Sequence, residues 1–347
     1  MSDLTLFGLA LLAAMGGLRP AGKTPQEKIS RTEHLEITYP AAAEAELSAF
    51  LNYGEGVYNR VDSLLPGALP PTLAVSLESG SRRGEDETGV VVNLEVEGPA
   101  EVLFAGQLAR VAVRSLAGDA YDLDAFRFVF AGLAAWVAEE YEREAGIRRP
   151  RWLWAAYAYM QEATYLEYLE VYERASDELG SNVVTAVGYT LVSLLVERDG
   201  LQGLERLLRA LARNADLCAA LDDSGLDCAR FTADWSSALE AEAARHDFAS
   251  APSVESDLIV SDQGELRQVD LWVHVRNPET NAFNFFVQYV VNGEQREEVY
   301  AAEGPDYQVR IPLGQQETGA EILWDVAVWS DTLQLWVRGG WQNRVVR

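Results

Sequence analysis

The stretch AGQLAR, residues Ala105–Arg110, lies in the middle of a run whose apolar side chains recur at helical spacing from about Glu101 to Leu116. This run opens the longest helical part of the chain. From Ala100 to about Asp247 the pattern predicts helices almost without interruption, and glycines follow two of the expected helix ends. The expected helices cover residues 101–116, 123–144, 152–179, 182–199, 201–213 and 228–246.

A smaller unit precedes these helices. His34–Pro40 alternates like a strand that is stopped by proline, and residues 41–65 carry apolar side chains at helical spacing. Residues 73–77 and 90–96 have the composition of short buried strands. The order strand, helix, strand, strand predicts a small mixed sheet with a helix packed on it.

The pattern changes after a loose Ala/Ser/Pro stretch at Ala249–Val254, which marks a domain boundary. Apolar side chains then alternate with polar ones along residues 269–275 and 283–291, and Asn292-Gly293 is a hairpin signal. Further short strands are expected, and the whole pattern predicts an immunoglobulin-like β-sandwich. The fold class is therefore α+β: a small mixed sheet with a helical bundle, followed by an all-β sandwich. The expected divisions are 1–32, 33–248 and 255–347.

Composition and charge restrict the possible partners. Hydrophobic residues make up 48% of the 347 residues and charged residues 24%, which is a globular composition. The formal net charge of −26 repels phosphate backbones, so nucleic acid is excluded as an expected partner. An acidic surface that keeps the protein in solution explains this charge without any specific cation site.

Two features point to a location outside the cytoplasm. Leu4–Leu18 is an apolar run ending in small residues, as in a secretory signal or a membrane tether, although no basic residue precedes it. Residues 19–32 are expected to be a polar linker. The two cysteines, Cys218 and Cys228, flank a turn-forming stretch, and in an oxidising compartment they can form a disulfide. Two buried thiols remain the alternative.

Four fragments resemble the peptidase MA-like domain, a gluzincin-type zinc metallopeptidase family. Residues 33–40 (EHLEITYP) resemble its opening strand, EHF-x-I-x-YP, and residues 130–136 (FAGLAAW) resemble the segment AEGLAEY, which supplies the third zinc ligand. Residues 189–200 (YTLVSLLVERDG) and 231–235 (FTADW) resemble two later helical segments of that family. The resemblance implies a zincin-like fold over residues 33–247.

The same resemblance implies that the zinc site has been lost. Such enzymes carry His-Glu-x-x-His on one helix, with the glutamate as general base. Here Gly106 and Arg110 stand in the histidine positions and Gln107 in the glutamate position. The third ligand falls at Ala131, or at Ala155 in a second possible register. The chain has only three histidines, and none has a partner at zincin spacing.

These observations predict a catalytically inactive, peptidase-like protein that acts in binding or scaffolding, with no cofactor and no metal. The expected partner is a protein or peptide, including a cell-surface component, held in a groove beside Val92, Leu94 and Trp136. The alternative is a divergent hydrolase or metallopeptidase with relocated catalytic residues. Several tryptophans of the sandwich either pack between strands or stack on sugars, and both interpretations stay open: Trp272, Trp329, Trp336 and Trp341.

Overall fold

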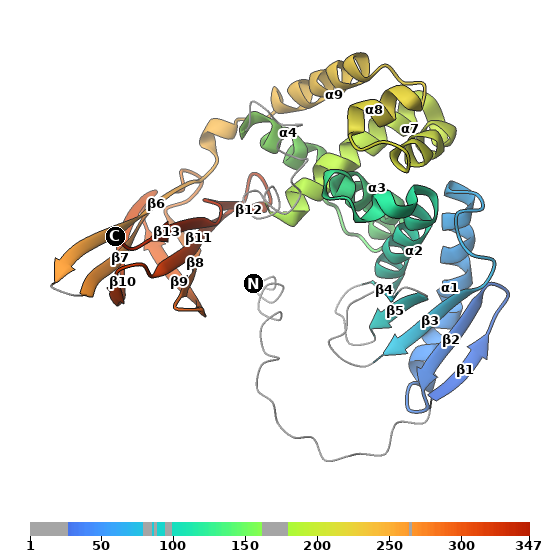
Figure 1. Ribbon diagram of the computed structural model, residues 1–347, viewed down its shortest axis with the longest axis horizontal. Helices are drawn as coiled ribbons and strands as arrows, with labels where there is room; N and C mark the ends of the chain where they lie inside the picture. Colours follow the sequence, from blue (N-terminus) through green and yellow to red (C-terminus); the bar gives the residue numbers. More distant parts are fainter. Residues whose placement is uncertain (1–26, 79–84, 87–88, 94–98, 162–179, 264–265) are drawn as a thin grey trace.

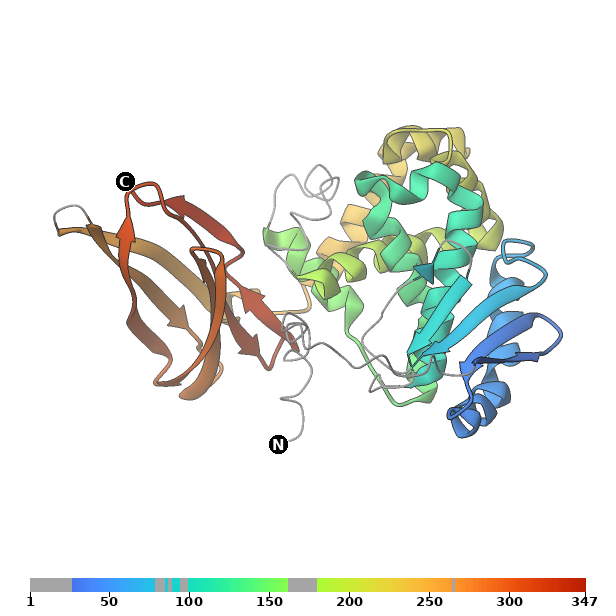
Figure 2. The same ribbon diagram turned by 60° about the horizontal axis from the view of Figure 1, so that its bottom comes forward.

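The structure, a computed structural model, describes residues 27–78, 85–86, 89–93, 99–161, 180–263 and 266–347 (Figure 1). Its class is α+β, as the sequence predicts. Helices and a small sheet form the first part of the chain, and antiparallel strands form the last part (Figures 1 and 2).

The N-terminal sheet is mixed, with the strand order β1-β2-β3-β5-β4. The three inner strands run parallel, and both edge strands are antiparallel to their neighbours. Helix α1 packs on β2, and α2 packs on β5. These elements are β1 (Glu27–Arg31), β2 (Leu35–Pro40), α1 (Glu44–Leu64), β3 (Leu73–Glu78), β4 (Glu85–Asp86), β5 (Gly89–Asn93) and α2 (Ala100–Ala117).

The helical part is built around α7, which packs against α2, α3, α4 and α8. Gly200 has φ 67° and ψ −173°, so α7 is two helical segments joined at a kink, as the expected helix end at this glycine predicts. The remaining elements are η1 (Gly118–Asp122), α3 (Asp124–Glu144), α4 (Arg151–Gln161), α7 (Ser181–Leu211), α8 (Leu217–Asp223), α9 (Cys228–Ala243) and η2 (Phe248–Ser250).

The C-terminal domain consists of two antiparallel sheets, with orders β10-β7-β6 and β12-β11-β8-β9, and β13 also pairs with β11. Buried side chains alternate along β7, β8 and β11, and Trp324 of one sheet donates to Ser256 Oγ of the other at 2.9 Å. The strands are β6 (Ser253–Gln263), β7 (Leu266–Arg276), β8 (Ala282–Val291), β9 (Glu294–Glu303), β10 (Asp306–Glu317), β11 (Glu321–Ser330), β12 (Leu335–Arg338) and β13 (Gln342–Val345).

Two segments differ from the sequence prediction. The expected linker contains β1, a mostly exposed edge strand that the backbone ladder to β2 holds in place. The expected boundary at Ala249–Val254 is shorter, because β6 already begins at Ser253 and pairs along β7. In both segments the strand is held by backbone hydrogen bonds to its neighbour. Such bonds do not require alternating apolar side chains, so hydrophobic periodicity did not predict these strand residues.

Candidate functional site

Helix α2 has two different faces. Phe104 and Leu108 are fully buried and pack into the core. Gly106 and Gln107 are half-buried and Arg110 is exposed, so all three belong to the outward-facing side of the helix. The three positions that resemble His-Glu-x-x-His therefore share one helix face, next to β5.

Gln107, which the resemblance places at the general-base position, ties α2 to the sheet. Its Nε2 donates a hydrogen bond of 2.9 Å to the carbonyl oxygen of Val91 in β5. Only the amide nitrogen can donate to a carbonyl, so this contact fixes the orientation of the side-chain amide. Its Oε1 is buried and has no hydrogen-bond partner in the described part of the chain. A glutamine in this position holds two elements together and cannot accept a proton as a carboxylate would.

Gly106 and Arg110 leave the histidine positions without ligands. A Cβ atom at Gly106 would meet nothing within 4 Å, so the backbone there has room for a larger side chain. We also expect from the sequence that Arg110 fills the former metal cavity and pairs with a neighbouring carboxylate. The part about the cavity is wrong, because the side chain is exposed. Pairing with a carboxylate stays a prediction, since acidic residues near α2 lie outside the described residues. A long cationic side chain on an open helix face gains more from hydration than from burial.

The packing of the helices distinguishes the two candidates for the third ligand position. Ala131 is half-buried on α3, which packs directly against α2. Ala155 is fully buried on α4, and the main packing partners of α4 are α7 and α9. A ligand side chain at Ala155 would have to enter the core. Of the two positions that the resemblance suggests, Ala131 is therefore the one on a helix that packs against α2.

The two expected groove residues that the structure describes, Val92 and Trp136, both pack against the core. Val92 is 8% exposed and packs into the core, so its side chain is unavailable to a peptide lying outside the sheet; this part of the groove prediction is wrong. Val91, on the opposite face of β5, is half-buried. Trp136 is half-buried and packs against the core from α3. Leu94 lies outside the described residues.

The family-like fragments lie where the helices pack most closely. A Cβ atom at Gly132 would stand 2.0 Å from the carbonyl carbon of Gly188, and one at Gly188 would stand 1.8 Å from the carbonyl oxygen of Phe128. Helices α3 and α7 thus touch backbone to backbone. Nearby, Trp235 of α9 donates to Thr190 Oγ1 of α7 at 3.0 Å. These three helical fragments have a packing role that does not depend on any zinc chemistry.

A buried ion pair that hydrophobic periodicity does not predict connects α3 and α4. Arg151 Nη2 lies 2.5 Å from Glu142 Oε2, and Arg149 Nε lies 3.1 Å from Glu142 Oε1. The Arg151 guanidinium also lies over the Tyr189 ring, 5.0 Å from its centroid. Burial raises the pKa of Tyr189 to about 12, so the phenol stays neutral. The only signal in the sequence was a cluster of arginines after an acidic helix end, and such clusters are common on surfaces.

The histidines are paired with carboxylates in three separate places. The closest contacts are His34 Nδ1 with Glu55 Oε2 at 2.9 Å, His246 Nε2 with Glu242 Oε1 at 3.1 Å, and His274 Nε2 with Asp306 Oδ1 at 2.9 Å. The hydrogen bond with Glu55 raises the pKa of His34. Within the described ranges no group of three or more His, Cys, Asp and Glu side chains is arranged to hold a metal ion.

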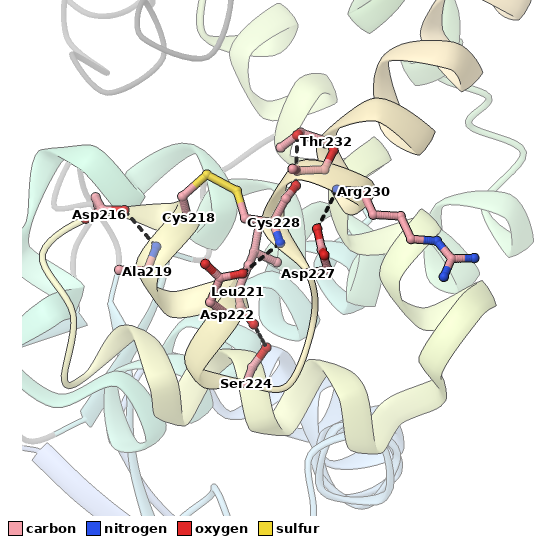
Figure 3. Close-up of a disulfide and its surroundings, with 11 residues drawn as sticks. Asp216, Cys218, Ala219, Leu221, Asp222, Ser224, Asp227, Cys228, Arg230 and Thr232 are labelled. Atoms are coloured by element: carbon pink, nitrogen blue, oxygen red, sulfur yellow. Dashed lines mark hydrogen bonds between the residues drawn. A yellow bond between two sulfur atoms is a disulfide. The ribbon is translucent and has the colours of Figure 1, made fainter.

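A disulfide joins Cys218 and Cys228, whose Cα atoms lie 5.2 Å apart (Figure 3). It links α8 to the first residue of α9. Asp216 and Asp227 cap the two helices by accepting backbone N–H groups of their first turns. Asp222 Oδ1 accepts the backbone N–H of Cys228 at 2.8 Å. The sequence is compatible with either a disulfide or two buried thiols, and the structure contains the disulfide. The bond closes a compact turn between two capped helices.

The apolar run Leu4–Leu18 lies outside the described residues. Over the described ranges, none of the helices has both the length and the apolar character needed to cross a bilayer.

Comparison with known proteins does not assign the chain to a family: no protein-family model and no curated protein matches it. The resemblance to the peptidase MA-like domain therefore stays a prediction, based on the four sequence fragments.

Proposed function

We propose that this chain is a non-catalytic binding or scaffolding protein with a peptidase-like frame. The observation that carries the proposal is the hydrogen bond between Gln107 Nε2 and the Val91 carbonyl. The side chain at the general-base position connects helix to sheet, and the flanking positions Gly106 and Arg110 offer no metal ligand. We derive no hydrolytic step from these side chains.

An extended peptide lying along β5 is the ligand that this site suits best. Among the described residues β4 pairs with β5 at Gly89 and Val90, and the proposed peptide would continue this edge from Val91 onward. Unpaired strand edges accept peptides through backbone hydrogen bonds. The Val91 carbonyl already accepts from Gln107, and its second lone pair is what a peptide N–H would use.

The disulfide supports a role outside the cytoplasm. Structural disulfides persist in oxidising compartments and are rare in the cytosol. The Cys218–Cys228 bond closes a short loop between two capped helices. We therefore propose that the protein is secreted or membrane-tethered.

Metal analysis and a peptide library together test the proposal. The purified full chain is expected to hold no stoichiometric zinc and to bind members of an extended-peptide library saturably, without cleaving them. Gln107→Ala frees the Val91 carbonyl and is expected to change peptide affinity, whereas Leu51→Ala, at an exposed position on α1, is the control. Tightly held zinc or cleaved peptide would favour the enzyme alternative, and the absence of peptide binding would eliminate the groove.

Rebuilding the metal site tests the resemblance itself. Gly106→His, Gln107→Glu and Arg110→His restore the helix ligands and base, and Ala131→Glu restores the third ligand. Gly106 has room for the imidazole, because its Cβ position is open. The fourfold variant is expected to bind zinc more tightly than the threefold variant that keeps Ala131. Equal zinc affinity in two folded variants would show that Ala131 is not the counterpart of a ligand.

A further inference from the structure

A cleft of about 560 Å³ lies between the two domains, within the range of roughly 300–1,000 Å³ typical of small-molecule sites. Its lining residues come from β8, β9, β11 and β12 on one side and from α4 and the start of α7 on the other. Figures 1 and 2 show where these strands and helices lie. Trp154 of α4 closes one end by donating from Nε1 to the carbonyl of Leu333 at 2.8 Å. The cleft is therefore framed by both domains.

Three aromatic rings form a platform on the sheet wall. Trp329 and Trp336 are cross-strand partners on β11 and β12, and their rings meet edge to face with centroids 5.6 Å apart and an interplanar angle of 68°. Phe286 of β8 lies edge-to-face with Trp336 at 4.7 Å. Trp329 keeps 37% of its surface exposed, and its Nε1 donates to Asp331 Oδ1 at 2.9 Å. This hydrogen bond fixes the orientation of the Trp329 indole, which remains partly exposed to solvent.

Planar polar groups border the aromatic platform. Gln288 Nε2 donates to Glu297 Oε2 at 2.8 Å across β8 and β9. Arg338 binds Asp325 Oδ2 through Nε, at 2.7 Å, and through Nη2. The Nη1 atom of Arg338 has no partner among the described residues. The cleft thus offers donors and acceptors that are held rigidly beside the rings.

Both arginines of the described cleft lining are held in ion pairs, in a chain whose net charge is −26. The described lining carries two cationic side chains, Arg149 and Arg338, and two carboxylates, Glu297 and Asp325. Arg149 pairs with Glu142 at 3.1 Å, and Arg338 pairs with Asp325. Because each arginine already has a carboxylate partner, the described lining of the cleft attracts an anionic ligand only weakly. It suits a neutral ligand with many hydroxyl groups.

We propose that this cleft binds a neutral oligosaccharide. A sugar ring has an apolar face of C–H groups, which packs on an exposed indole such as Trp329, and equatorial hydroxyl groups, which reach planar amide, carboxylate and guanidinium groups at its edge. Exposed Ser181 and Asn182, on the opposite wall, supply further polar partners. This proposal is independent of the peptide groove beside α2.

The test is isothermal titration of the full chain with a panel of neutral oligosaccharides: gluco-, manno-, xylo- and N-acetylchito-oligomers. At least one is expected to bind saturably, with an affinity that changes little with salt. Trp329→Ala is expected to weaken that binding by about tenfold, the loss of one stacking contact. Trp272→Ala, in the other sheet of the same domain, is the matched control and is expected to bind as the wild type does.

Three outcomes would overturn the proposal. The first is that no sugar in the panel binds. The second is that Trp329→Ala, shown to be folded by its circular dichroism, binds as tightly as Trp272→Ala. The third is that a choline salt or a proline-rich peptide binds at the tryptophans while the sugars do not, since either ligand would assign the aromatic platform to another chemistry.

Discussion

Replacing Gly132 with alanine places a methyl group where α3 and α7 touch backbone to backbone. The new carbon would start 2.0 Å from the Gly188 carbonyl carbon and 2.2 Å from the Tyr189 nitrogen. Ordinary contact between carbon atoms is about 3.5 Å, so the helices must separate by about 1.5 Å at this point. The obstacle is backbone, which cannot rotate away as the end of a side chain can.

The expected cost follows from two opposing contributions. Overpacking in a tight core costs about 3 kcal/mol at the upper end of its usual range. Alanine in place of glycine inside a helix returns about 1 kcal/mol. Gly132→Ala should therefore lower the free energy of unfolding by about 2 kcal/mol.

Gly106→Ala is the matched control, because it makes the same chemical change inside a helix where nothing lies within 4 Å of the new carbon. It should raise the free energy of unfolding by about 1 kcal/mol. Urea titration followed by the helical circular dichroism signal reports on this part of the protein, because the other domain is all β. The reasoning is refuted if Gly132→Ala is as stable as Gly106→Ala.

Three further predictions concern stability. Cys228→Ser should cost about 3 kcal/mol by the loop-closure estimate, and reductant should lower the melting temperature of the wild type but not of this variant. Glu142→Gln should cost about 3 kcal/mol, because it leaves a buried arginine unpaired, whereas Glu144→Gln at an exposed position of the same helix should cost little; equal effects in thermal melts would contradict this. The raised pKa of His34 means that its stabilising contact with Glu55 is lost as pH rises through that pKa. Burial acts to raise the pKa of Glu55, but the hydrogen bonds that its carboxylate accepts outweigh burial, and the net pKa is lowered. The contact is therefore also lost as pH falls through the lowered pKa of Glu55. The contribution should be greatest between the ordinary values of 4.5 and 6.5, and Glu55→Gln should lower the pKa of His34 measured by NMR titration.

Much of the fold could be predicted because it depends on local hydrophobic periodicity. Helix α2, expected at residues 101–116, spans Ala100–Ala117, and Asn292-Gly293 turns the chain between β8 and β9 with positive φ at both residues. The sequence did not indicate β1 or α8. Strand β1 is mostly exposed and depends on backbone pairing with β2, and α8 is a short helix held by a capping aspartate and a disulfide.

The candidate sites were only partly predictable, because their contacts are not local. The sequence indicated the positions of Gly106, Gln107 and Arg110, yet the bond from Gln107 to Val91 depends on how α2 packs beside β5. For Trp329 and Trp336 the sequence left two interpretations open, packing between strands and stacking on sugars. The alternation of the strands does not say what lies opposite this face of the sheet. What lies opposite depends on how α4 and the start of α7 are placed against this face.

The hydrogen bond from Trp154 to Leu333 joins the two domains at the cleft, so domain docking and ligand binding are thermodynamically coupled there. Because one wall belongs to each domain, a molecule bound there contacts both, and its affinity is linked to how firmly the domains dock. This linkage is reciprocal. If the bound ligand raises the equilibrium constant for domain docking by some factor, docking raises the affinity for the ligand by the same factor. Trp154→Phe, which removes the bond and keeps most of the ring, would therefore weaken ligand binding without altering a single group of the aromatic platform.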